Sequence, residues 1–91
     1  MNRAETLIDR VEKRGMSRYA LSKASGVPDS TLSDIQSGKL GVSPKVAALI
    51  APYAGIDPRA AALQAIIDAE KNETKREQLI KLLQPDDWRK R

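Results

Sequence analysis

The side chains of this sequence that could do chemistry are mostly cations, and they are most in excess in its first half. Up to Lys45 the chain has eight lysines and arginines against five acidic residues, whereas the remainder has eight against seven. A local excess of positive charge suits a phosphate-binding surface, although a mild excess is common among globular domains. The eight cations are Arg3, Arg10, Lys13, Arg14, Arg18, Lys23, Lys39 and Lys45.

Two chemically versatile residue types, cysteine and histidine, are missing from the 91 residues. Their absence rules out disulfides and cysteine-based metal sites, and it removes the usual general base and the nucleophile pairs that depend on histidine. We therefore expect no enzyme, no metal and no cofactor. No apolar signal segment opens the chain, and no apolar run reaches membrane-spanning length, so we expect a cytoplasmic protein without a membrane partner.

The elements that must position the cations are predicted to be helices. Alanine, leucine, lysine and glutamate favour helices, and no strand-like alternation of useful length occurs. The length suggests one domain, so we expect an all-α fold of five or six helices. Start signals and apolar spacing predict helices over residues 3–14 and 18–25, from 28 or 29 onward, from 44 to an early end near 51, over 58–71, and up to about 83. We expect a break near Asn72, although the fifth and sixth helices could also form one continuous helix.

The segment from residue 17 to 38 reads as two short helices joined by a tight turn. Leu21 lies on the inner side of the first helix, and Gly26 supplies the backbone freedom that a sharp turn requires. Leu32 and Ile35 are three residues apart, so they share one face of the second helix and point back toward the first. This spacing is typical of a helix-turn-helix.

This segment resembles the helix-turn-helix of the Cro and phage-repressor family, and the resemblance extends over roughly two thirds of the chain. It implies a lambda-repressor-like DNA-binding domain whose partner is double-stranded operator DNA. One departure is Ser22, where the family commonly has alanine; its hydroxyl can bond back to the preceding turn. The residues that carry the resemblance are Leu21, Gly26, Val27, Thr31, Leu32, Ile35, Ser37 and Gly38.

The resemblance places the second helix of the motif in the major groove, with outward side chains near its start touching base edges. Serine can donate or accept a hydrogen bond, whereas a carboxylate only accepts and so suits the amino group of cytosine or adenine. Helix capping explains the presence of Asp29 as well as base reading does. Asp34 could instead lie on a solvated surface or form an ion pair. The base-reading candidates are Asp29, Ser30, Ser33 and Asp34.

Phosphate contacts, on the same resemblance, come from the start of the motif's first helix and from the loop after the reading helix. Arg18 stands where the family usually has glutamine. It could bind a phosphate, or it could instead pair with Asp29 and hold that carboxylate for base reading. The candidates are Ser17, Arg18, Tyr19, Lys39, Ser43 and Lys45.

The region after residue 56 brings more aliphatic side chains than a small helical core needs. They could complete the core or form a dimer interface. We favour the dimer, because one module binds weakly and two half-sites about 34–36 Å apart multiply affinity. The aliphatic residues from Leu79 to Leu83 are expected to form the buried side of the last helix. The dimerisation candidates are Leu63, Ile66, Ile67, Leu79, Ile80, Leu82, Leu83 and Trp88, although Trp88 could instead cover the helix pair within one subunit.

The sequence thus predicts a transcriptional repressor that binds a two-fold symmetric operator as a homodimer and, by analogy, a phage or prophage regulator. Residues 1–56 would bind DNA, residues 57–84 would complete the core and dimerise, and residues 85–91 would form a basic tail. Two alternatives stay open. One is the antitoxin of a toxin–antitoxin pair, with a toxin or antirepressor as partner; the other is a helical interaction module without DNA binding.

Overall fold

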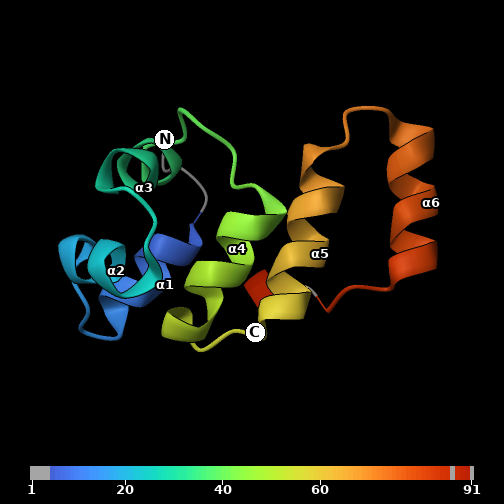
Figure 1. Cartoon of the computed structure of the whole chain (residues 1–91). Coiled ribbons are helices and arrows are strands. Elements are labelled where there is room, and N and C mark those ends of the chain that lie inside the picture. The colour runs from blue at the N-terminus through green and yellow to red at the C-terminus, as the bar shows by residue number, and fades with distance from the viewer. Residues whose placement is uncertain (1–4, 87, 91) are drawn as a thin grey trace.

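The computed structural model describes residues 5–86 and 88–90, and every regular element among them is helical. The helices follow one another without a strand in this part of the chain, which confirms the all-α prediction (Figure 1). In chain order the elements are α1 (Leu7–Lys13), α2 (Arg18–Ser25), α3 (Asp29–Gln36), α4 (Pro44–Ile50), the 3-10 turn η1 (Ala51–Ala54), α5 (Pro58–Ala69), α6 (Glu73–Leu83) and the 3-10 turn η2 (Trp88–Lys90).

Polar side chains cap the starts of most helices. Ser17, Ser43 and Asn72 each accept a hydrogen bond from the backbone N–H three residues further on, over 3.0 to 3.3 Å. Such a cap typically stabilises a helix by about 1 kcal/mol. The cap at Asn72 starts α6 after a three-residue break, so α5 and α6 are two helices.

The first helix is shorter than the sequence indicated. Residues 3 and 4 lie outside the described part of the chain, and residues 5 and 6 are not helical. Thr6 caps α1 instead: its hydroxyl accepts from the Asp9 N–H, and its own N–H donates to the Asp9 carboxylate at 2.9 Å. This reciprocal capping box fixes the start of α1 at Leu7. The fifth helix also ends early, at Ala69 rather than Lys71.

Proline determines where α4 ends. The α-helix stops at Ile50, and the chain continues through Pro52 as the 3-10 turn η1. Proline has no N–H for a helical hydrogen bond and its ring crowds the preceding turn. Gly55 then closes the turn with a φ of 74°, a left-handed conformation that glycine adopts without strain. The predicted early end is confirmed.

The hydrophobic core lies among the first four helices. The largest fully buried side chains are Ile8, Val11, Leu21, Leu32 and Ile50. On the other side of α4, helix α5 packs through small buried side chains that include Ala61 and Ala65, so the two helix backbones can approach closely. Within this core α1 contacts both α2 and α3, and α4 contacts α2, so residues 18–36 pack on α1 and α4.

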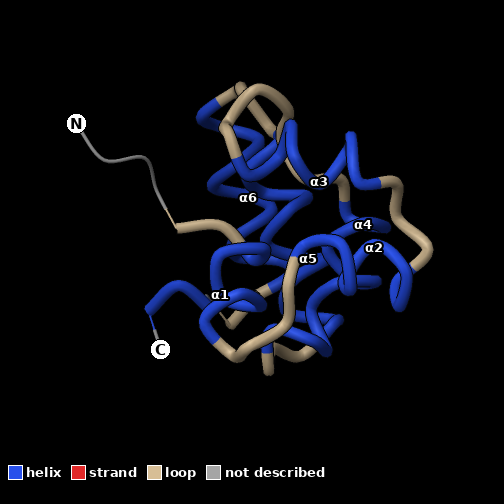
Figure 2. The backbone as a smooth tube through the Cα atoms, turned by 90° about the vertical axis from the view of Figure 1, so that its left-hand side faces the viewer, coloured by secondary structure: helices blue, strands red, loops and turns tan. Residues whose placement is uncertain are grey.

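The last two elements, α6 and η2, pack against different parts of the molecule. Figure 1 shows α6 at one end of the molecule, with α5 between it and α4. Leu79 and Leu83 are half-buried there, but Ile80 and Leu82 are 46% and 79% exposed. The predicted buried side of α6 is therefore wrong for Ile80 and Leu82, because α5 is its main neighbour and hides only the side chains that face it. The turn η2 instead returns to α1 (Figure 2).

Candidate nucleic-acid interface

Helices α2 and α3 are joined by a turn that serine side chains fix in place. Gly26 adopts a φ of 80° at the end of α2. The Ser22 hydroxyl donates to the Val27 carbonyl at 2.6 Å, and the Ser25 oxygen accepts from the Val27 N–H at 3.2 Å. Both polar backbone groups of Val27 are thus bonded to α2. Ser22 does not bond to the preceding turn as predicted; its bond crosses the turn and connects α2 to the segment before α3.

The four base-reading candidates, which we call the reading face, lie along α3. Asp29 and Ser30 are exposed in its first turn, and Ser33 and Asp34 are half-buried further along. The N-cap position of α3 is Pro28, and no side chain caps it. The capping explanation for Asp29 is therefore wrong. The Asp34 carboxylate makes no ion pair within the described residues, so a polar role toward solvent or DNA stays open to it.

Arg18 pairs with Asp29, one of the two roles that the sequence left open for it. Its Nε donates to the Asp29 carboxylate at 2.9 Å, and its Nη1 donates to the Gln36 side-chain oxygen at 3.3 Å. The Arg18 side chain remains 35% exposed, so its guanidinium is still accessible from solvent. This ion pair offsets part of the negative charge of the Asp29 carboxylate and holds it at the start of α3.

Gln36 is a polar residue of this site that the sequence reasoning missed. Its side-chain nitrogen donates to Asp9 at 3.0 Å and also to Glu12, so the last residue of α3 is bonded to α1 as well as to Arg18 of α2. The spacing of seven residues from Asp29 places both on one face of a helix, which was the available signal. The partners on α1 could not be read from the sequence.

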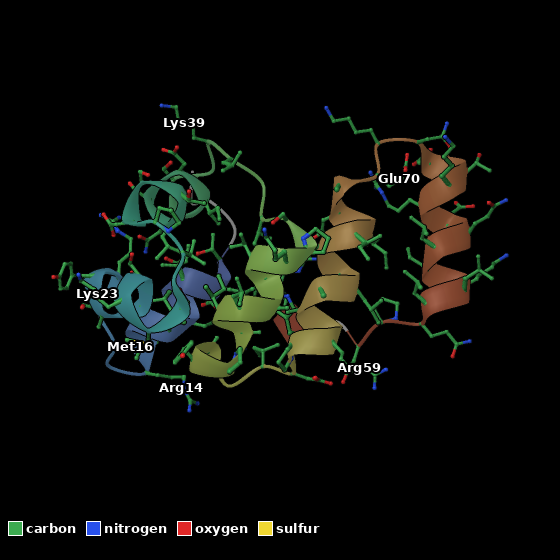
Figure 3. All side chains as sticks on the ribbon, viewed as in Figure 1. Arg14, Met16, Lys23, Lys39, Arg59 and Glu70 are labelled. Atoms are coloured by element: carbon green, nitrogen blue, oxygen red, sulfur yellow. The ribbon has the colours of Figure 1, made fainter. Side chains whose placement is uncertain are left out.

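The phosphate candidates surround the reading face without forming one cluster. Ser17 and Ser43 are exposed N-caps whose oxygens accept backbone hydrogen bonds, so each hydroxyl still has a hydrogen to donate. Tyr19 is 68% exposed, and the Lys23 ammonium lies 5.5 Å from the centre of its ring. Lys39 and Lys45 are exposed as well, and Figure 3 shows Lys39 at the outer edge of the molecule beside α3.

The dimerisation candidates divide into buried and accessible side chains. Ile67 is 3% exposed and Trp88 is 8% exposed, and Trp88 belongs to the core that contains α1. The Arg10 guanidinium lies 5.0 Å above the Trp88 ring. An interface role for these two residues is therefore wrong. Trp88 instead packs into the core of its own chain. Leu63 is half-buried, and Ile66 is 37% exposed on α5.

At Glu5 the Lys13 ammonium hydrogen-bonds to the carboxylate and, with Arg10, lowers its pKa below 4.5 against the opposing effect of burial. Within residues 5–86 and 88–90, no group of three acidic residues comes close enough to hold a metal ion. None of the helices described is both long and apolar enough to cross a membrane.

The geometry defines a class of protein. Two short helices meet across a glycine turn, the second presents polar side chains at its exposed start, and surface cations flank it. This is the arrangement by which helix-turn-helix proteins bind DNA.

A comparison with protein families supports that class. The family model described as Helix-turn-helix matches residues 7–60, which is more than half of the chain. The chain therefore belongs to the helix-turn-helix family of the Cro/C1 type, and it is a DNA-binding regulator of that type. The match ends inside α5, so α6 and η2 lie beyond it. No curated protein and no solved structure matched the chain.

Proposed function

We propose that this protein is a transcriptional repressor that binds a two-fold symmetric operator as a homodimer. Residues 1–56 bind DNA in this proposal, and residues 57–84 complete the core and join the two subunits. The family resemblance also suggests a phage or prophage regulator, and a cytoplasmic location follows from the position of operator DNA in the cell.

The observation that carries the DNA-binding part is the Arg18–Asp29 pair at the start of α3. A carboxylate facing a phosphate-lined groove is repelled unless a cation accompanies it, and Arg18 lies 2.9 Å away. Asp29 can then accept a hydrogen bond from the amino group of cytosine or adenine. Ser30, exposed beside it, can donate or accept, and Lys39 and Lys45 can bind phosphates on the flanking backbone.

Helix α6 supports the dimer. It has no buried residue, although it contains four aliphatic side chains. An isolated helix of this length is marginal in water, so most of its stability must come from packing. Within one subunit only α5 packs against it substantially. Leu82 at 79% exposure and Ile80 at 46% are the apolar groups that a second copy would cover.

The position of α6 bears on the spacing of the half-sites. Helices α3 and α6 lie toward opposite ends of the molecule, whose longest dimension is 38 Å (Figure 1). Subunits joined through α6 would therefore hold their reading helices further apart than the 34–36 Å of one DNA turn that the sequence suggested. We expect half-sites separated by two turns, about 20 base pairs.

Sedimentation tests the dimer directly. Replacing Ile80 and Leu82 with glutamate places two charges on the proposed interface, and we expect the sedimentation mass to fall to that of a monomer. Thr74→Glu, in the first turn of α6 and eight residues before Leu82, is the matched control and should stay dimeric. A monomeric wild-type protein, or a double variant with an unchanged mass, would reject this interface.

The same exposed surface on α6 favours one second candidate. An antitoxin uses a DNA-binding module for autorepression and its terminal helices to hold a toxin, and Leu82 and Ile80 could contact such a partner. A wild-type protein that is monomeric alone, yet co-purifies with a second small protein of its operon, would favour this function. An interaction module without DNA binding is distinguished by the absence of salt-dependent DNA binding.

A further inference from the structure

Gln36 connects the far end of the reading helix to both neighbouring helices. Its side-chain oxygen accepts from Arg18 of α2 at 3.3 Å, and its nitrogen donates to Asp9 of α1 at 3.0 Å and to Glu12. Arg18 in turn holds Asp29 at 2.9 Å. A continuous series of polar contacts therefore runs from α1 to the first residue of the reading face.

The α1 end of this series is itself fixed. Asp9 uses one carboxylate oxygen to accept from the Thr6 N–H at 2.9 Å, within the capping box that starts α1. Its other oxygen accepts from Gln36. The Asp9 carboxylate cannot turn away from Gln36 without breaking the helix cap, so it is a well-oriented anchor.

The chemistry of the position calls for an amide. The side chain at 36 must donate toward two carboxylates on α1 and accept from a guanidinium on α2, and glutamine has one group for each task. Glutamate would keep the acceptor for Arg18 but would bring a third negative charge to Asp9 and Glu12. Lysine would keep the donor for α1 but would repel Arg18. The two substitutions therefore separate the two halves of the contact.

We propose that Gln36 is a positioning residue that determines the base preference of Asp29 through Arg18, without touching DNA itself. The proposal rests on the proposed DNA-binding function. Arg18 can reach solvent, Asp29 or a phosphate, and the Gln36 oxygen restricts it to an orientation in which Nε faces Asp29. With that restriction removed, the guanidinium is free to turn to the phosphates, and the Asp29 carboxylate loses its fixed direction.

The test compares Gln36→Lys, Gln36→Met and Gln36→Glu for binding to the DNA sequence that the wild type selects. The base pair read by Asp29 is identified first, as the one whose replacement no longer matters in Asp29→Asn. Thr74→Lys and Thr74→Glu on α6 are controls that add the same charges elsewhere. Fluorescence anisotropy gives the affinity for the selected sequence and for the sequence changed at that base pair, and thermal unfolding checks the fold.

We expect Gln36→Lys and Gln36→Met to lower discrimination at the Asp29 base pair by a factor on the order of ten, while discrimination at other pairs is kept. Gln36→Glu should keep that discrimination and instead unfold at a lower temperature. A uniform loss at every base pair, or the same loss in Gln36→Glu as in Gln36→Lys, would overturn the proposal. If the wild type selects no sequence, the proposed function itself fails; if it selects one and the Gln36 variants still discriminate, only this inference fails.

Discussion

Removing the Lys39 charge should change how steeply DNA binding depends on salt. In the proposed dimer, the exposed Lys39 and Lys45 would make four phosphate contacts, two from each subunit. Arg18, whose charge is partly offset by Asp29, would add between none and two more. At about 0.9 per contact, the slope of log affinity against log salt is between about −3.6 and about −5.4. Raising salt from about 50 to about 200 mM then weakens binding between about 150-fold and about 1,800-fold.

Lys39→Ala removes two contacts from the dimer, so the slope should become less steep by about 1.8. Fluorescence anisotropy on a labelled duplex at a series of salt concentrations measures it. Arg59→Ala is the control, because Arg59 lies at the edge of the molecule opposite Lys39 (Figure 3), and it should leave the slope unchanged. A wild-type slope shallower than about −1, or an equal effect of Arg59→Ala, would refute the reasoning.

Two further predictions concern stability and pH. Ser22→Ala removes the 2.6 Å hydrogen bond to the Val27 carbonyl and should cost about 1 kcal/mol, which lowers the melting temperature by roughly 4–8 °C, whereas Ser37→Ala, which removes a bond at an exposed site, should change it little. Because Lys13 lowers the pKa of Glu5, the stabilisation is present above the ordinary value of 4.5 and is lost as pH falls through the lower folded pKa. An NMR titration should place the Glu5 midpoint below 4.5, and Lys13→Ala should raise it, with Lys23→Ala as the unaffected control; a midpoint that ignores Lys13 contradicts this pairing.

Local signals made most of the fold predictable. Ser17 and the pair Ser43-Pro44 start helices through bonds within one turn, and Pro52 ends α4 by its own chemistry. The start of α1 was misplaced because the apolar spacing begins before the helix does. The capping box of Thr6 and Asp9 determines where the helix starts.

Features that depend on distant partners were not predictable. Gln36 bonds to residues 24 and 27 positions away on α1, and no spacing rule indicates such a pair. For α6, the apolar stripe showed which side is apolar but not whether anything covers it, so Leu82 was placed in the interior. Trp88 could have lain in either setting, and the return of η2 to α1 decides for the core.

Selection of bound fragments from random DNA tests the central claim most directly. Our account predicts enrichment of one short half-site, repeated in inverted orientation, with the two copies about two helical turns apart. Fragments without any enriched sequence would contradict sequence-specific binding by α3, and a single unpaired site would contradict the homodimer.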